Sequence, residues 1–373
     1  MSEAAQRRRV RRSLARWLGP WTPAVQAPRD VIRQERSLEM ADGRTLRARY
    51  YLPKGRAPVG AILVSHGIHY LGATDPRFDR FCRVLATSGL AVMAPLLVDY
   101  IRLEPRPRLI PDVLRGYDLL VQQPEIRPSW RPGVFSISFG SLLALRLAAH
   151  PDYAQRIGAA VLFGGYADWS GTMRYMINGA VDGQAADDQR NPLNRPVVFI
   201  NLLPNMPDKP SDPAALIEAW KRYVRRVWPF PEMKELENRR PIIERIAKTV
   251  ADDARERFLQ GCGLAEGGDE IVLNALEDAD HFRSFLDPRA HLGPLVCPIT
   301  AVHGVADDVI HHTQLEVLAE AMPPDADITL LRTGLYSHAN SEASLGLQAI
   351  AREISVLLQT LDGIVSAGMT RAP

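Results

Sequence analysis

The chain has 373 residues, of which 46% are hydrophobic and 24% charged, which is ordinary for a globular protein with a sizeable core. A formal charge of +2 gives no argument for nucleic-acid binding. No apolar run has the length of a membrane span or signal peptide, and three cysteines lack disulfide or zinc spacing (Cys82, Cys262 and Cys297). We therefore expect a cytoplasmic protein with one large α/β domain or two smaller ones, and with buried thiols.

Residues 1–30 form a basic segment ahead of the main fold. Six arginines lie near its start (Arg7, Arg8, Arg9, Arg11, Arg12 and Arg16). Four apolar residues fall on one face of the same predicted helix (Val10, Leu14, Trp17 and Leu18). Such a helix can make a peripheral contact with an anionic membrane. The interpretation that we favour is that the apolar face, with Trp21, packs against the main domain while the arginines stay solvated. Prolines from Pro20 onward end the helix.

Strands and helices alternate in the pattern that follows. Strands at 36–40 and 46–52 flank Asp42-Gly43, which is a hairpin turn signal. Short apolar strands are predicted at 61–64, 90–93, 133–137 and 157–163, with helices at 78–89, 113–121 and 141–149 between them. This order predicts an α/β fold with a mostly parallel central sheet flanked by helices.

The alternation lapses between residues 166 and 295. That stretch is rich in proline and helical in pattern, and its apolar run at 197–203 either lines a pocket or forms the core of the module. Strands return at 299–302 and 328–331, with helices at 314–321 and 343–361. We therefore expect a core of residues 31–165 and 296–373, interrupted by a helical cap that covers the site crevice as a lid.

Ser138 is the candidate nucleophile. In Ser136-Ile137-Ser138-Phe139-Gly140, small residues stand two before and two after the serine. They permit a sharp strand-to-helix turn that exposes the serine Oγ and points the next backbone N–H at a developing oxyanion. The motif alone is weak, because it is expected by chance roughly 0.4 times in a chain of this length. The plain alternative is that Ser138 caps a helix N-terminus. The motif's position between a predicted buried strand and a predicted helix strengthens it.

A serine nucleophile needs a base and an acid that orients the base. Asp307 follows the strand at 299–302, and His338 follows the strand at 328–331, so both stand where loops at the carboxyl end of a parallel sheet converge. Gly304 leaves room for a turn that brings Asp307 inward. Asp308 and Asp168 remain alternative acids. His69 lies near the turn after the strand at 61–64.

Four features together resemble the α/β-hydrolase superfamily, and in particular its serine esterases and lipases that carry an inserted helical cap. They are the His66-Gly67 turn, the Ser138 elbow, the Gly304-x-x-Asp307 turn and His338 before the last helix. The resemblance covers about residues 36–163 and 298–361. It implies an oxyanion hole from the backbone N–H groups of Phe139 and Ile68, with Gly67 and His69 beside the substrate. Ser136 departs from the glycine that usually stands there.

The sequence thus predicts a serine hydrolase that cleaves the ester or thioester bond of a small-molecule acyl substrate, with no cofactor and no metal. The acidic loop with Asp278, Asp280 and His281 is interpreted as solvated, not as a metal site. Two alternatives use the same fold: an acyltransferase with the same triad, and a non-catalytic binding protein. A complete nucleophile, acid and base at strand ends argues against the second.

Overall fold

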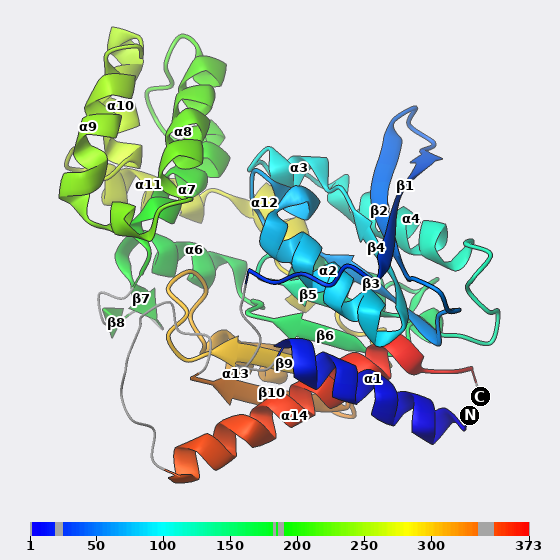
Figure 1. Ribbon diagram of the computed structural model, residues 1–373. Helices are drawn as coiled ribbons and strands as arrows, with labels where there is room; N and C mark the ends of the chain where they lie inside the picture. Colours follow the sequence, from blue (N-terminus) through cyan, green and yellow to red (C-terminus); the bar gives the residue numbers. More distant parts are fainter. Residues whose placement is uncertain (1, 19–24, 182–183, 186–189, 335–346, 373) are drawn as a thin grey trace.

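The computed structural model describes residues 2–18, 25–181, 184–185, 190–334 and 347–372. An eight-stranded sheet forms the centre, in the order β1-β2-β4-β3-β5-β6-β9-β10 (Figure 1). β1 and β2 form the predicted hairpin, β2 also pairs antiparallel with β4, and every other pairing in this sheet is parallel. The mostly parallel sheet is therefore confirmed. The strands are β1 (Val31–Glu39), β2 (Thr45–Pro53), β3 (Gly60–Ser65), β4 (Leu90–Pro95), β5 (Gly133–Ile137), β6 (Ala160–Phe163), β9 (Ile299–Gly304) and β10 (Ile328–Thr333).

Helices cover both faces of the sheet, so every residue of the central strands β3 and β4 is buried. Alternate residues of β3 point to opposite faces, so Ala61 and Leu63 join one buried cluster while Ile62 and Val64 join another. The first cluster includes side chains of α4 (Leu109–Val121), α5 (Gly140–Ala148) and α13 (Gln314–Ala321). The second includes side chains of α1 (Glu3–Leu18), α2 (Pro76–Ser88) and α14 (Leu347–Met369).

Some predicted boundaries differ from the structure. β6 begins at Ala160 and not at 157, because a 3-10 turn (η2, Ala154–Arg156) leads into it. The helix predicted at 113–121 begins earlier, at Leu109, and the last helix extends to Met369. The predicted start of that last helix, at 343–346, lies outside the described residues. The remaining short elements of the core are α3 (Val98–Ile101) and η1 (Gly72–Thr74), and η6 (Arg289–His291) lies in the segment between β6 and β9.

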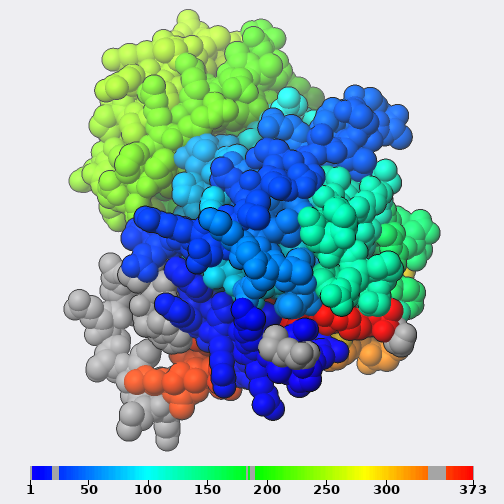
Figure 2. Space-filling view, turned by 45° about the vertical axis from the view of Figure 1, so that its right-hand side comes forward, coloured from blue at the N-terminus to red at the C-terminus, as the bar shows by residue number. Residues whose placement is uncertain are grey.

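A helical insertion stands between β6 and β9 and forms the lobe in green and yellow in Figure 2. On α8 the stripe of Leu216, Trp220, Tyr223 and Val227 is fully buried. The apolar run near residue 200 forms a helix, α7. The elements are α6 (Trp169–Asn178), β7 (Ala180–Val181), β8 (Gln184–Ala185), η3 (Pro192–Asn194), α7 (Arg195–Leu202), η4 (Leu203–Asn205), α8 (Pro213–Val227), η5 (Pro231–Lys234), α9 (Leu236–Ala247), α10 (Asp252–Gly261), α11 (Gly268–Glu277) and α12 (Asp280–Leu286).

The N-terminal helix α1 packs its apolar face against the core, between α2 and α14. Val10 and Leu14 are buried in the same cluster as α14 side chains, and Arg11 pairs with Asp362 of α14 at 3.2 Å. Arginines on the opposite face, Arg12 among them, are exposed. Trp21 lies outside the described residues. The contact of this basic face with a membrane stays a prediction of the sequence.

All three cysteines are buried and unpaired, as expected. Within the described part of the chain, no helix combines the length and the apolarity that a bilayer crossing demands. The same residues contain no group of three or more histidine, cysteine or acidic side chains placed to hold a metal ion.

The packing of α1 predicts an asymmetric effect of two substitutions on stability. Leu14→Ala removes a fully buried side chain, so we expect the free energy of unfolding to fall by about 2–4 kcal/mol. Arg12→Ala, two residues away on the exposed face, should change it by less than about 0.5 kcal/mol. Urea unfolding followed by circular dichroism measures both. Equal stability of the two variants would mean that α1 is not docked.

Candidate active site

Ser138 sits in a sharp turn between β5 and α5, as the sequence predicts. Its φ angle is +54°, a left-handed conformation that is uncommon for residues other than glycine. Its N–H donates to the Phe163 carbonyl at 2.8 Å, and its carbonyl accepts from the Ser141 N–H at 2.9 Å. A Cβ atom on Gly140 would lie 2.8 Å from the carbonyl oxygens of Ser65 and His66. Only glycine therefore lets α5 start this close to the end of β3.

Ser136, the departure from the usual glycine, does not prevent the turn. Its side chain is fully buried, and its hydroxyl donates to the Val161 carbonyl of the neighbouring strand β6 at 3.4 Å. The hydroxymethyl group of Ser136 therefore fits between β5 and β6. The strained backbone conformation is at Ser138.

Two backbone N–H groups beside Ser138 are free to bind an oxyanion. Neither the N–H of Phe139 nor that of Ile68 donates a hydrogen bond within the part of the chain that the structure describes. The Gly67 turn lies against the serine, since a Cβ atom there would stand 3.4 Å from the Ser138 Oγ and 3.0 Å from its Cβ. This arrangement suits an alcohol nucleophile with two donors nearby.

His66 orients the peptide group that carries the Ile68 N–H. Its Nδ1 lies 2.8 Å from the Gly67 carbonyl, which can only accept, and the Leu97 N–H donates to its Nε2 at 3.3 Å. The proton is therefore on Nδ1, and the ring is neutral. Because a trans peptide group points its C=O and N–H in opposite directions, holding the Gly67 carbonyl aims the Ile68 N–H away from His66. Burial lowers the pKa of His66 to about 4.

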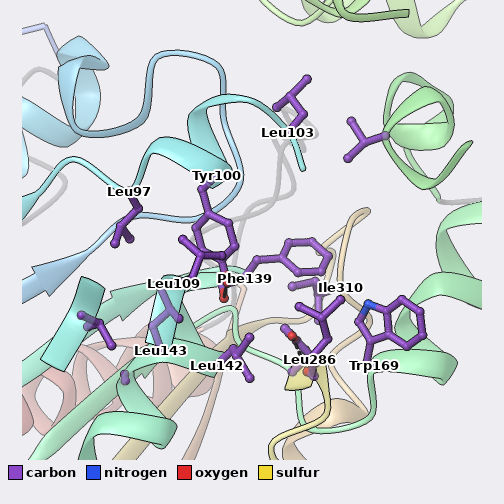
Figure 3. Close-up of a cluster of buried hydrophobic side chains, with 14 of the residues drawn as sticks. Leu97, Tyr100, Leu103, Leu109, Phe139, Leu142, Leu143, Trp169, Leu286 and Ile310 are labelled. Atoms are coloured by element: carbon purple, nitrogen blue, oxygen red, sulfur yellow. Dashed lines mark hydrogen bonds between the residues drawn. The ribbon is translucent and has the colours of Figure 1, made fainter. Parts of the chain in front are cut away.

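Buried side chains hold the turn at Ser138 from the core side. The Tyr100 hydroxyl, which is fully buried, donates to the Phe139 carbonyl at 2.8 Å. The Phe139 ring packs at 5.2 Å from the ring of Tyr166. Figure 3 shows Phe139 among apolar side chains from several elements, including Leu142 of α5 and Trp169 of α6. This packing fixes the position of the Phe139 N–H.

Asp307 follows β9, and each of its two carboxylate oxygens lies near hydrogen-bond donors. Oδ1 accepts from the Val309 N–H at 2.9 Å and from the Ile310 N–H at 3.0 Å, while Oδ2 lies 3.4 Å from Nε2 of His303. Oδ2 would also lie 3.2 Å from a Cβ atom on Gly164, which follows β6. Burial raises the pKa of Asp307, but these donors outweigh it, so the pKa is below its usual value and the group stays ionised.

The two rival acids are engaged elsewhere. Asp308 forms an ion pair with Lys234 of the insertion. Asp168 pairs with Arg289 at 3.1 Å and lines a different cavity from Ser138. This geometry favours Asp307 as the acid. His338 lies outside the described residues, so its assignment as the base rests on the sequence.

A cavity of about 610 Å³ opens above Ser138, between the core and the insertion. One face of the segment 194–201 lines it, with Val197 and Val198 in the middle and an asparagine at each end (Asn194 and Asn201). The charged side chains in its wall have ion-pair partners: Asp75 pairs with Arg77 at 2.8 Å, and Lys234 pairs with Asp308. Among the lining residues that the structure describes, the wall is therefore mostly apolar and its charged side chains are paired.

His69, which adjoins Ile68, lies in the wall of this cavity. The Leu71 N–H donates to its Nδ1 at 3.2 Å, so in the neutral ring the proton is on Nε2. The ring stacks on Tyr70 at 4.6 Å and on Trp228 of the insertion at 5.4 Å. Burial lowers the pKa of His69, which keeps it neutral. An aromatic stack thus joins the core to the insertion at the cavity.

Several residues of the site were not singled out from the sequence. Tyr100 and Trp228 look like ordinary core aromatics, and only tertiary contacts reveal what they support. The sequence could have drawn attention to His303. The pair His303-Gly304 at the end of β9 repeats the pair His66-Gly67 that follows β3.

This sheet, with its serine elbow and helical insertion, defines an α/β-hydrolase fold. Brefeldin A esterase, a bacterial homologue of human hormone sensitive lipase, is similar in structure, with 16% identity, a TM-score of 0.51 and coverage of 98% of this chain and 85% of that one. A 2,6-dihydroxy-pseudo-oxynicotine hydrolase has 17% identity and a TM-score of 0.48, covering 90% and 67%. Pyrococcus horikoshii acylaminoacyl peptidase has 12% identity and a TM-score of 0.49, covering 88% of this chain.

The chain spans only about 40% of the length of that peptidase. No protein-family model matches the chain, and no curated protein matches it in sequence.

The neutral state of His66 predicts a loss of stability in acid. The pKa of its side chain is about 4 in the folded protein against 6.5 in the unfolded chain, so below pH 6.5 the unfolded state takes up a proton that the folded state refuses. The contribution of His66 is full above pH 6.5 and falls by about 3 kcal/mol down to pH 4. In His66→Gln, the decline in unfolding free energy between these pH values should be shallower by about that amount. Parallel declines would contradict the assignment.

Proposed function

We propose that this protein is a serine hydrolase that cleaves a carboxylic ester or thioester through an acyl-enzyme. The observation that carries the proposal is the strained Ser138, which faces the end of β3 beside two backbone N–H groups without hydrogen-bond partners in the described chain. Backbone strain of this kind clusters at active sites. The α/β-hydrolase fold supports the proposal by analogy, since the fold alone does not determine the reaction.

In the proposed reaction, the Ser138 Oγ attacks the acyl carbon while His338 takes its proton. Asp307 holds the imidazole in the correct tautomer and stabilises its charged form. The N–H groups of Phe139 and Ile68 donate to the oxyanion of the tetrahedral intermediate. His338 then returns the proton to the leaving alcohol or thiol. Water, activated by the same base, releases the acyl group, and no cofactor takes part in these steps.

The cavity suggests the class of substrate. Its volume of about 610 Å³ is within the range of pockets that hold small organic ligands. The part of its wall that the structure describes is mostly apolar, and the charged side chains there are already paired. A charged acyl group would lose its hydration there without gaining a partner. We therefore infer a bulky, uncharged, largely apolar acyl substrate, and we infer that the insertion acts as a cap that shapes this cavity.

The first test is the hydrolysis of p-nitrophenyl esters from acetate to long acyl chains. We expect Ser138→Ala to lose activity by about 10³-fold or more. Each methylene that fits the apolar cavity should raise kcat/KM by up to about 4-fold, until the cavity is filled. Ser211→Ala, an exposed serine of the insertion, serves as the matched control. Full activity in Ser138→Ala would refute the proposal, and ester products formed with an added alcohol would indicate an acyltransferase.

The close approach of Gly67 predicts a second, sterically caused loss. In Gly67→Ala the new Cβ atom would stand 3.0 Å from the Ile137 carbonyl and from the Ser138 Cβ, so the turn must shift and carry the Ile68 N–H with it. Misplacement by about 1 Å reduces kcat by about 100-fold. Gly293→Ala, where a Cβ atom meets nothing within 4 Å, should keep the parent rate. Equal rates of the two variants would show that the Ile68 N–H is not part of the oxyanion hole.

A further inference from the structure

We propose that His303 is a positioning residue for the acid of the triad. Its Nε2–H lies beside Oδ2 of Asp307 and fixes this oxygen, which would accept the hydrogen bond from the base. The inference rests on the proposed function and names a fourth side chain on which the triad depends. His303 is in β9, four residues before Asp307, and its side chain is completely buried.

The hydrogen bonds of His303 determine where its proton is. Nε2 lies 2.8 Å from the Ile310 carbonyl and 3.4 Å from Oδ2 of Asp307. Both oxygens only accept, so Nε2 carries the proton, which it donates to the Ile310 carbonyl while it faces Oδ2 of Asp307. The same Ile310 donates its own N–H to Oδ1 of Asp307. His303 therefore braces both the loop after β9 and the carboxylate that this loop carries.

The surroundings of the other ring nitrogen favour the neutral form of His303. Nδ1 is buried and has no hydrogen-bond partner in the described part of the chain. A second proton there would place an unpaired N–H donor in a fully enclosed position, which is unfavourable. His303 thus offers a single placed donor, at Nε2.

This donor distinguishes the two oxygens of Asp307. Oδ1 already accepts from two backbone N–H groups, whereas Oδ2 is contacted only by His303 among the described polar groups. Oδ2 is therefore the oxygen left with room to accept from the imidazole of the base. His303 restrains this oxygen, and its positive Nε2–H helps to keep the carboxylate ionised.

Other titratable and charged groups around this pair do not duplicate the role. Tyr175 of α6 donates to the backbone carbonyl of Asp307 at 3.2 Å and not to its carboxylate. Arg332 of β10, which is paired in register with His303, forms an ion pair with Glu316 of α13. His312 is near enough to interact with Asp307 electrostatically, but burial lowers its pKa. Asp308 and Lys234 neutralise each other.

The test compares His303→Met, which fills the space without a donor, with His303→Gln, whose amide can restore one. For the Met variant we expect kcat to fall about 10- to 100-fold with KM changed less than about 2-fold. A carboxylate that loses a donor is more basic and holds the protonated base more firmly. The acid limb of the kcat/KM profile should therefore move to higher pH. The Gln variant should recover most of kcat and the parent limb.

His312→Gln is the matched control and should leave the limb in place. If His303→Met does not fold, His303→Asn replaces it, because the shorter amide cannot reach Oδ2, and the same loss is expected. A folded Met or Asn variant with the parent kcat and an unmoved acid limb would overturn the inference. In that case, loss of activity in Ser138→Ala would leave the proposed function intact. Retained activity in Ser138→Ala would instead refute the function itself.

Discussion

A left-handed backbone at Ser138 costs a residue other than glycine about 1–3 kcal/mol, and the surrounding structure is arranged to maintain it. The strands on either side of β5 hold the turn, through the Phe163 carbonyl of β6 and through the contact of Gly140 with the end of β3. The Tyr100 hydroxyl fixes the carbonyl of Phe139, the residue after Ser138, by a hydrogen bond. The parallel sheet is thus the frame that imposes the strain, and the exposed hydroxyl is its consequence.

The polar groups around this turn are likewise held in place by buried hydrogen bonds. Two strand-end histidines, His66 and His303, are buried and neutral, and each donates one proton to an oxygen of the site. His66 turns a peptide group so that its N–H is free, and His303 supports the carboxylate of Asp307. Because a charged group without donors is costly to bury, Asp307 can remain ionised only with this set of hydrogen bonds. Neutral donors thereby place charge where the proposed chemistry needs it.

Much of this could be predicted from the sequence because buried parallel strands are short apolar runs, and because loops at their carboxyl ends converge. The candidates Ser138 and Asp307 follow from that rule, whereas the pair of N–H groups is what the resemblance to α/β-hydrolases implies. The sequence could not show that residues 197–200 form a helix, since a short apolar run fits a helix or a strand equally. Nor could it show the tautomer of His303 or the stacking of Trp228 on His69, because both depend on contacts between segments distant in the chain.

The central claim is that Ser138 is a nucleophile activated by His338 and Asp307. The most direct measurement is the rate and the site of phosphonylation by a fluorophosphonate, with the modified peptide identified by mass spectrometry. The account predicts a single adduct on Ser138, formed much more slowly in His338→Gln and Asp307→Asn. An absence of labelling in the folded parent protein, an adduct on another residue, or a rate that does not depend on these two side chains would contradict it.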